Sequence, residues 1–310
     1  MANLGFVFPG QGSQSVGMLK DLIENFSVVK ETFDEASQVL GYDLLNLVLE
    51  GPAEELGKTF ITQPALLTSS VALFRLWQSK SDVLPSVMAG HSLGEYSALT
   101  CAGVISFADA VKLVKLRGEL MQEAVPAGVG AMAAVIGLDD QVIIDACKEA
   151  AQDEVCSAVN FNSPGQVVIA GNKAAVERAG EILKAKGAKR VLPLPVSVPS
   201  HCALMKSAAD KLAEALNNIE FNEPKIPVIN NVDVKVETDA KSIKDALVRQ
   251  LYSPVRWVET TQKITEDTMN LVEMGPGKVL AGLIKRINKE AVCVSCNDCA
   301  TLEQSLDLTK

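Results

Sequence analysis

The chain has 310 residues, 48% of them hydrophobic, which is enough to bury a sizeable core in one large domain with a smaller one attached. Its formal net charge of -9 argues against nucleic-acid binding, because duplexes are bound by clustered Lys and Arg side chains that displace counterions from phosphates. A membrane span is not expected either, because the longest largely apolar stretch covers only residues 128–138.

The first part of the chain alternates buried strands with helices, which predicts an α/β fold. Residues 4–8 are typical of a buried strand, and a glycine-rich loop ends it. Helical stretches follow near residues 17–40 and 64–79, and a second buried strand at residues 86–89 runs directly into another glycine-rich turn and a helix. We therefore expect a mostly parallel sheet flanked by helices, in an α/β-hydrolase-like large domain.

The middle of the chain carries six elements in the order β-α-β-β-α-β, which is typical of a ferredoxin-like unit. We predict a small ferredoxin-like subdomain at residues 127–198, inserted into a large catalytic domain formed by residues 1–126 and 199–310. The six predicted elements cover residues 131–136, 139–150, 155–160, 166–170, 173–186 and 190–194. Further apolar runs of the large domain lie at residues 226–230 and 270–274.

Basic side chains gather where the second helix of this subdomain is predicted to end. They could bind the phosphates of a nucleotide-bearing cofactor, or they could form an ordinary solvated helix end, and the sequence leaves both interpretations open. The cluster consists of Lys184, Lys186, Lys189 and Arg190.

The end of the chain contains a cysteine pattern that resembles a metal site. Cys293, Cys296 and Cys299 have the C-x2-C-x2-C spacing of iron–sulfur ligands, but the fourth ligand is missing. We favour a last core strand near residues 292–295, in which cysteine acts as a small hydrophobe, and we expect no metal. The chain has seven scattered cysteines and no basic segment before its first apolar run, so we expect free thiols, no signal peptide and a cytoplasmic location.

Residues 90–94 read Gly-His-Ser-Leu-Gly and match the G-x-S-x-G motif of a nucleophile elbow. They stand between a predicted strand and a predicted helix, as that motif requires. The glycines allow a tight turn that pushes the Ser92 hydroxyl out over the sheet edge, and the helix start aims N–H groups at developing negative charge. We hypothesise that Ser92 carries an acyl group as an ester. The alternative is a glycine-rich turn whose serine only caps the helix.

A serine hydroxyl needs a base to become a nucleophile at neutral pH, and histidine is the usual one. The chain contains two histidines, His91 and His201. His91 adjoins Ser92 in sequence, so the elbow is expected to turn its side chain away and leave it to pack beside the turn. His201 is therefore the expected base.

Arg117 lies within a helix predicted over residues 107–123, on the face where its neighbours are apolar. A guanidinium at such a position must be paired, because an uncompensated buried charge costs several kcal/mol. Its partner is either a structural Asp or Glu, or the carboxylate of an acidic substrate, which arginine grips bidentately.

The loop that follows the first strand contains Gly10, Gln11 and Gly12. It does not complete the G-x-G-x-x-G fingerprint of dinucleotide sites, because Ser15 stands where the third glycine belongs. A loop that lends an N–H group to an oxyanion hole is the better interpretation.

Four stretches together resemble the malonyl-coenzyme A:acyl carrier protein transacylases of bacterial fatty acid synthesis, and the resemblance extends over nearly the whole chain. They are residues 8–14, 62–65, 90–95 and 198–201, which read FPGQGSQ, TQPA, GHSLGE and VPSH. The resemblance implies that Ser92 is the nucleophile, that His201 is the base and that Arg117 holds the malonyl carboxylate. It also implies transfer from coenzyme A to the phosphopantetheine thiol of acyl carrier protein, with the coenzyme A thioester as substrate, no permanently bound cofactor and no metal.

The same resemblance assigns further residues that the pattern of residue types does not reveal. The backbone N–H groups of Gln11 and Leu93 would form the oxyanion hole. The backbone carbonyl of Gln250 would orient His201, which places it in the catalytic set. Gln63 and Asn162 fall in stretches near the substrate cleft.

Two other functions stay open. A serine esterase or thioesterase of the α/β-hydrolase type would share the Ser92 elbow but give the acyl group to water. In that fold an Asp or Glu and then a late His follow the serine, and no histidine follows His201 in this chain. The second alternative is a scaffold in a multienzyme assembly that keeps the fold without the chemistry.

Overall fold

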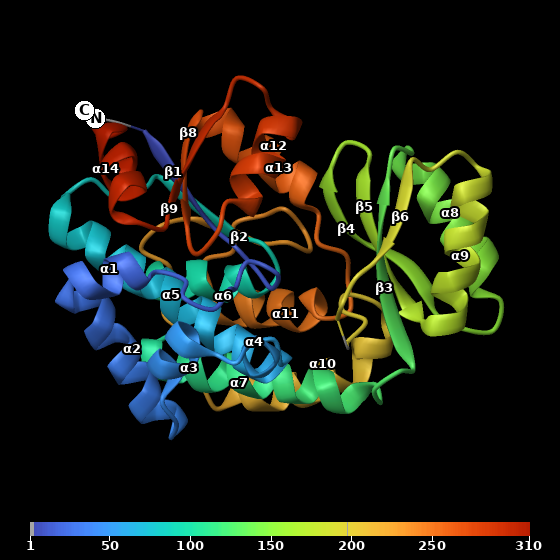
Figure 1. The fold of residues 1–310 in the computed structure, drawn as a ribbon, viewed down its shortest axis with the longest axis horizontal. Helices are drawn as coiled ribbons and strands as arrows, with labels where there is room; N and C mark the ends of the chain where they lie inside the picture. Colours follow the sequence, from blue (N-terminus) through green and yellow to red (C-terminus); the bar gives the residue numbers. More distant parts are fainter. Residues whose placement is uncertain (1–2, 197) are drawn as a thin grey trace.

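The computed structural model describes residues 3–196 and 198–310, which form two units with one β-sheet each (Figure 1). The larger unit contains a five-stranded sheet with the strand order β7-β2-β1-β8-β9, in which all neighbours pair in parallel. This confirms the expected α/β fold with a mostly parallel sheet. The strands are β1 (Leu4–Phe8), β2 (Val87–Gly90), β7 (Val228–Ile229), β8 (Asn270–Met274) and β9 (Val292–Cys296).

Helices cover both faces of this sheet, and its central strand β1 is therefore buried along its whole length. Phe6 and Phe8 belong to the larger core, and Val7 between them belongs to the core on the other face, as the two-residue period of a strand requires. Of the helices described, none combines the length and the apolarity of a membrane span. The helices of this unit are α1 (Lys20–Asn25), α2 (Ser27–Leu40), α3 (Leu44–Glu50), α4 (Ala53–Leu56), α5 (Thr59–Lys80), α6 (Leu93–Cys101), α7 (Phe107–Ala124), α10 (Lys206–Asn217), α11 (Ala240–Gln250), α12 (Trp257–Asp267), α13 (Val279–Ile287) and α14 (Cys299–Asp307), with a short 3₁₀ turn at Ala203–Met205.

The close approach of α7 to α5 determines where Arg117 lies. The two helices pack against each other, and Gly118 of α7 lies against the first turn of α5. A Cβ atom on Gly118 would lie 2.6 Å from the Cα atom of Phe60, so only glycine fits at this crossing. The neighbouring Arg117 is thereby brought within hydrogen-bond distance of Gln63 on α5.

The smaller unit is an antiparallel sheet with two helices, shown in green and yellow in Figure 1 beside the larger unit. Its six elements occur in the predicted β-α-β-β-α-β order, and the strand order in the sheet is β4-β5-β3-β6. Its strands and helices have their own apolar core. They are β3 (Gly130–Ile136), α8 (Asp140–Ala151), β4 (Cys156–Ser163), β5 (Gln166–Asn172), α9 (Lys173–Ala185) and β6 (Arg190–Pro193).

Two predicted helix boundaries were wrong. The single helix expected near residues 17–40 is divided into α1 and α2, because Phe26 between them is extended. The helix expected at residues 64–79 begins at Thr59, so that Pro64 lies inside it. Proline is favoured in the first turn of a helix, which explains why the sequence pattern places the start too late.

Candidate active site

Ser92 lies in a strained turn between β2 and α6. Its φ of 52° is a left-handed conformation that side chains other than glycine rarely adopt. Two glycines make the turn possible: a Cβ atom on Gly90 would lie 1.9 Å from the carbonyl of Gly94, and one on Gly94 would lie 2.1 Å from the Phe8 carbonyl oxygen. The predicted elbow between a strand and a helix is therefore present. Its backbone segments lie so close together that no side chain fits at Gly90 or Gly94.

The backbone amides around the elbow are assigned to different partners. The Ser92 amide donates to Asn231 Oδ1 at 2.8 Å, and the Gly94 and Glu95 amides close turns to the carbonyls of His91 and Ser92. The amide of Leu93, at the first position of α6, donates to no backbone carbonyl of the described residues. It is thus the N–H group of this turn that an oxyanion can use.

His201 contacts the serine hydroxyl directly. Its Nε2 atom lies 2.8 Å from Ser92 Oγ, and its Nδ1 atom lies 2.8 Å from the carbonyl oxygen of Gln250. A carbonyl can only accept a hydrogen bond, so Nδ1 carries the proton and the lone pair of Nε2 faces the hydroxyl. The expectation that His201 reaches Ser92 across 109 positions of sequence is confirmed.

The ionisation of His201 is controlled by its surroundings. The side chain is only 3% exposed. Burial, and next to it the positive charge of Arg117, lowers the pKa of His201 to about 3, while the hydrogen bond to the Gln250 carbonyl opposes this shift. The imidazole is therefore neutral at physiological pH, as a proton acceptor must be.

Arg117 is buried beside the nucleophile, and the hydrogen bonds of its guanidinium go to uncharged groups. Its Nη1 atom donates to Gln63 Oε1 at 2.8 Å, and its Nη2 atom donates to Gln250 Oε1 at 3.1 Å and to Ser92 Oγ at 3.3 Å. No ion pair joins it to an Asp or Glu of the described residues. Its guanidinium lies over the ring of Tyr96, 5.2 Å from the centroid. The nearest buried carboxylate, Glu95, acts on Arg117 electrostatically and through Gln250 without forming an ion pair, so the guanidinium remains available to pair directly with an anion.

His91 turns away from the nucleophile, as expected. Its Nε2 atom lies 2.8 Å from Asn162 Oδ1, and its ring packs against Trp257. Asn162 thus contacts His91, which lines the site cavity. Burial lowers the pKa of His91.

Ser92, His201 and Arg117 line a cavity of about 560 Å³. Its lining contains five of the expected site residues, namely Gln11, Ser92, Leu93, Arg117 and His201. The other three expected residues, Gln63, Asn162 and Gln250, are not among the lining residues, and they contact residues that are.

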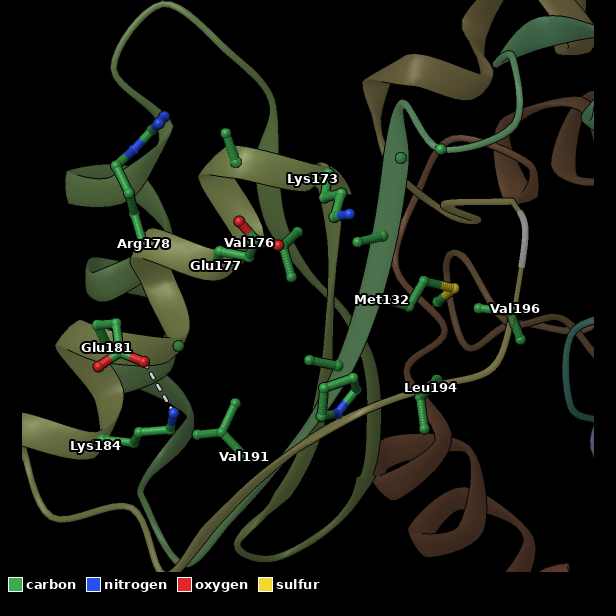
Figure 2. Close-up of a pocket in the computed structure, with 17 residues that line it drawn as sticks. Met132, Lys173, Val176, Glu177, Arg178, Glu181, Lys184, Val191, Leu194 and Val196 are labelled. Atoms are coloured by element: carbon green, nitrogen blue, oxygen red, sulfur yellow. Dashed lines mark hydrogen bonds and ion pairs between the residues drawn. The ribbon is translucent and has the colours of Figure 1, made fainter.

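A second cavity of about 870 Å³ lies in the smaller unit, between α9 and the strands β3 and β6 (Figure 2). Met132, Leu194 and Val196 line both cavities, so the two are neighbours. Lys184, one of the residues that line it, is paired with Glu181 at 2.8 Å, which for this side chain favours the solvated helix end over a phosphate site.

Two residues of the site were not found from the sequence. The Oδ1 atom of Asn231 accepts a hydrogen bond from the Ser92 amide, and its Nδ2 atom donates to the Gly90 carbonyl at 2.7 Å. Glu95, which is 2% exposed, accepts from the Gln250 side chain at 2.9 Å. Glu95 could have been noticed as the single acidic side chain in an apolar helix, whereas nothing in the local sequence marks Asn231.

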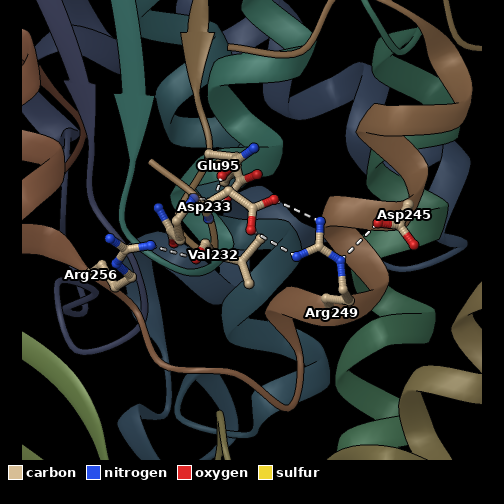
Figure 3. A network of polar contacts seen from close by, with 8 residues as sticks. Glu95, Val232, Asp233, Asp245, Arg249 and Arg256 are labelled. Atoms are coloured by element: carbon tan, nitrogen blue, oxygen red, sulfur yellow. Dashed lines mark hydrogen bonds and ion pairs between the residues drawn. The ribbon is translucent and has the colours of Figure 1, made fainter. Parts of the chain in front are cut away.

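A network of ion pairs holds the segments that carry Asn231 and Gln250 together (Figure 3). Arg249 donates to both carboxylate oxygens of Asp233, at 2.9 and 2.7 Å, and to Asp245 at 2.7 Å. The two parallel Arg249–Asp233 hydrogen bonds, here called the Arg249–Asp233 fork, join the loop after β7 to the last turn of α11. They therefore fix these two segments relative to each other.

The three cysteines of the C-x2-C-x2-C pattern lie on two different elements. Cys293 and Cys296 belong to β9, and Cys299 begins α14, where its thiol contacts Asp21. Within the described residues, no three His, Cys, Asp or Glu side chains are grouped in a way that could hold a metal ion. The expected last strand is confirmed.

Comparison with known proteins agrees with this geometry. The family model described as "Acyl transferase domain" matches residues 5–300. This chain belongs to the acyl transferase family. Among its relatives in the family is the malonyl CoA-acyl carrier protein transacylase of Salmonella typhimurium, which is 63% identical and aligned over 99% of both chains. That of Bacillus subtilis is 46% identical over 100% of this chain and 98% of its own.

Solved structures of acyl transferases have the same fold. An acyl carrier protein S-malonyltransferase from Vibrio cholerae has a TM-score of 0.96 at 65% identity, and it covers 97% of this chain and 99% of its own. A malonyl-transacylase solved in complex with a type II polyketide synthase (PKS) acyl-carrier protein has a TM-score of 0.97 at 63% identity, covering 98% and 99%.

Proposed function

We propose that the chain transfers a malonyl group from coenzyme A to the phosphopantetheine thiol of acyl carrier protein, through an ester on Ser92. The observation that carries this proposal is the buried Arg117, whose Nη2 atom lies 3.3 Å from the nucleophile and which forms no ion pair with a carboxylate of the described residues. The names of the relatives support the same substrate and partner.

In the first half-reaction, the Oγ atom of Ser92 attacks the thioester carbonyl while His201 Nε2 takes its proton. The oxyanion is held by the amides of Leu93 and Gln11, both of which line the cavity. The new C–O bond forms, the C–S bond breaks, and the coenzyme A thiolate leaves with the proton from His201.

The second half-reaction repeats these steps with a different acceptor. The phosphopantetheine thiol of the carrier gives its proton to His201 and attacks the malonyl ester. The C–S bond forms, the C–O bond breaks, and Ser92 recovers its proton. This is a ping-pong cycle in which coenzyme A and the carrier use the same cavity in turn.

Arg117 selects the acyl group by its charge. A malonyl carboxylate neutralises the buried guanidinium, whereas an acetyl group leaves that charge without its anion. Binding of the anion also offsets the effect of Arg117 on His201, which makes the imidazole a stronger base when malonyl is present.

The rival function is hydrolysis. A carboxylate would complete the triad of an α/β-hydrolase, but the group that accepts from His201 Nδ1 is the carbonyl of Gln250, which favours the transferase. The test is to incubate the protein with labelled malonyl-coenzyme A and the carrier bearing its phosphopantetheine arm. We expect label on the carrier; release of free malonate at the same rate with and without carrier would favour the esterase.

We propose an α/β-hydrolase-like domain at residues 1–126 and 199–310 and a ferredoxin-like subdomain at residues 127–198. The separate core and the strand order β4-β5-β3-β6 of the smaller unit support it. The seven free cysteine thiols favour a cytoplasmic location.

A further inference from the structure

Glu95 is a buried carboxylate that the acyl-transfer mechanism does not use. It lies on α6 one turn after Ser92, and its side chain is 2% exposed. It forms no ion pair with a described Lys, Arg or His residue. A buried carboxylate costs several kcal/mol unless hydrogen bonds hold it, so its presence beside the nucleophile requires a reason.

Both recorded hydrogen bonds of Glu95 converge on one of its oxygens. The Oε2 atom accepts from Gln250 Nε2 at 2.9 Å and from the backbone amide of Asn231 at 3.0 Å. Gln250 and Asn231 are the two residues that hold His201 and the Ser92 amide. One carboxylate oxygen therefore lies at the junction of the two segments that support the catalytic pair.

The direction of the Gln250 amide follows from its three polar neighbours, namely Glu95, the Ser92 carbonyl and Arg117. An amide side chain can be turned either way, and its partners decide which end faces which. On one side Nε2 donates to the Glu95 oxygen at 2.9 Å and to the backbone carbonyl of Ser92 at 3.0 Å. On the other side Arg117 only donates, so it requires Oε1, which it reaches at 3.1 Å. If the amide were reversed, its NH₂ group would face the guanidinium and two donors would oppose each other.

We propose that Glu95 is a positioning residue for acyl selection: it accepts from Gln250 Nε2 beside the Ser92 carbonyl, and this bond stabilises the amide direction that holds Arg117 in place for the malonyl carboxylate. This inference rests on the proposed function. It adds to that function a residue, Glu95, that orients Arg117 through Gln250 without contact with the substrate.

The acceptor, rather than the negative charge, carries this function. Burial raises the pKa of Glu95 to about 7, against the opposing effect of the Asn231 and Gln250 hydrogen bonds. A proton on Oε1 leaves Oε2 free to accept both bonds. A glutamine at this position can place its own carbonyl oxygen where Oε2 lies, whereas leucine offers no acceptor at all.

The test compares Glu95→Gln and Glu95→Leu with the unchanged protein. The quantity measured is the ratio of kcat/KM for malonyl-coenzyme A to that for acetyl-coenzyme A, with the carrier as acceptor. We expect Glu95→Leu to lower this ratio by about tenfold or more and Glu95→Gln to keep it within about threefold. A matched control is Glu273→Leu, which removes another fully buried carboxylate that accepts from the amides of Leu280 and Ala281.

The control should lose stability and keep the ratio. Retention of the malonyl preference in a folded Glu95→Leu protein would overturn the inference, and so would an equal loss in Glu95→Gln. If Glu95→Leu does not fold, the Glu95→Gln variant and a crystal structure of it decide: the Gln250 amide must keep Oε1 toward Arg117. Absence of any malonyl preference in the unchanged protein would instead overturn the proposed function.

Discussion

The Nη2 atom of Arg117 lies 3.3 Å from the Oγ atom of Ser92, so a fixed positive charge stands beside the atom that forms the acyl bond. Replacing Arg117 with alanine should lower kcat/KM for malonyl-coenzyme A by about a hundredfold or more, because truncating one member of a buried charge pair costs about 2–5 kcal/mol. Steady-state rates with acetyl-coenzyme A should fall by about tenfold at most. An unchanged malonyl preference would contradict the assigned role. Arg75→Ala, which breaks an ion pair with Glu35, is the control.

Asn231 should affect both acyl donors equally. Its side chain holds the Ser92 amide and the Gly90 carbonyl but does not contact Arg117. We expect Asn231→Ala to slow acylation of Ser92 by about tenfold, the effect of losing about 1–2 kcal/mol of elbow support, with malonyl and acetyl donors alike. Single-turnover rates with the two donors measure this. A selective loss of malonyl transfer would assign Asn231 to the clamp instead.

The rate of acylation should not show the usual fall toward acidic pH that protonation of a catalytic histidine causes. The pKa of His201 is lowered to about 3, so the imidazole stays neutral and active as the pH falls through the ordinary histidine value of about 6.5. Activity should be lost only at far lower pH. In Arg117→Ala, one cause of the lowered pKa is removed, so the fall in activity should move toward higher pH. Profiles of kcat/KM for acetyl-coenzyme A, which both proteins can use, would reveal a fall near pH 6.5 in the unchanged protein if this is wrong.

The glycines of the elbow should tolerate no side chain. A Cβ atom on Gly94 would lie 2.1 Å from the backbone oxygen of Phe8, so Gly94→Ala should destabilise the fold by roughly 3 kcal/mol and abolish acylation. Urea unfolding measures the first effect. The matched control is Gly282→Ala in α13, where a Cβ atom meets nothing within 4 Å and the change should stabilise by about 0.5–1 kcal/mol. Equal stabilities for both variants would refute the packing argument.

The sequence was most informative where function depends on local geometry. The elbow could be predicted because a buried strand, two glycines, Ser92 and a helix follow one another directly. His201 followed from the scarcity of histidine, and the apolar helix face marked Arg117. That Arg117 forms no ion pair needed the structure, because its partners depend on where α5 places Gln63 and where the end of α11 places Gln250.

The supporting network could not be predicted in the same way. The orienting group for His201 is a backbone carbonyl, which any residue at position 250 would supply, so the residue type carries no signal. Asn231 reaches the elbow across 139 positions. Its position depends on how the loop after β7 folds over α6 and on the Arg249–Asp233 fork, neither of which has a local pattern.

The intact mass of the protein after brief mixing with malonyl-coenzyme A tests the central claim most directly. We predict that the unchanged protein gains the mass of one malonyl group, that addition of the carrier bearing its phosphopantetheine arm removes it, and that Ser92→Ala gains nothing. The absence of an adduct on the unchanged protein, or an equal adduct on Ser92→Ala, would contradict a covalent malonyl ester on Ser92.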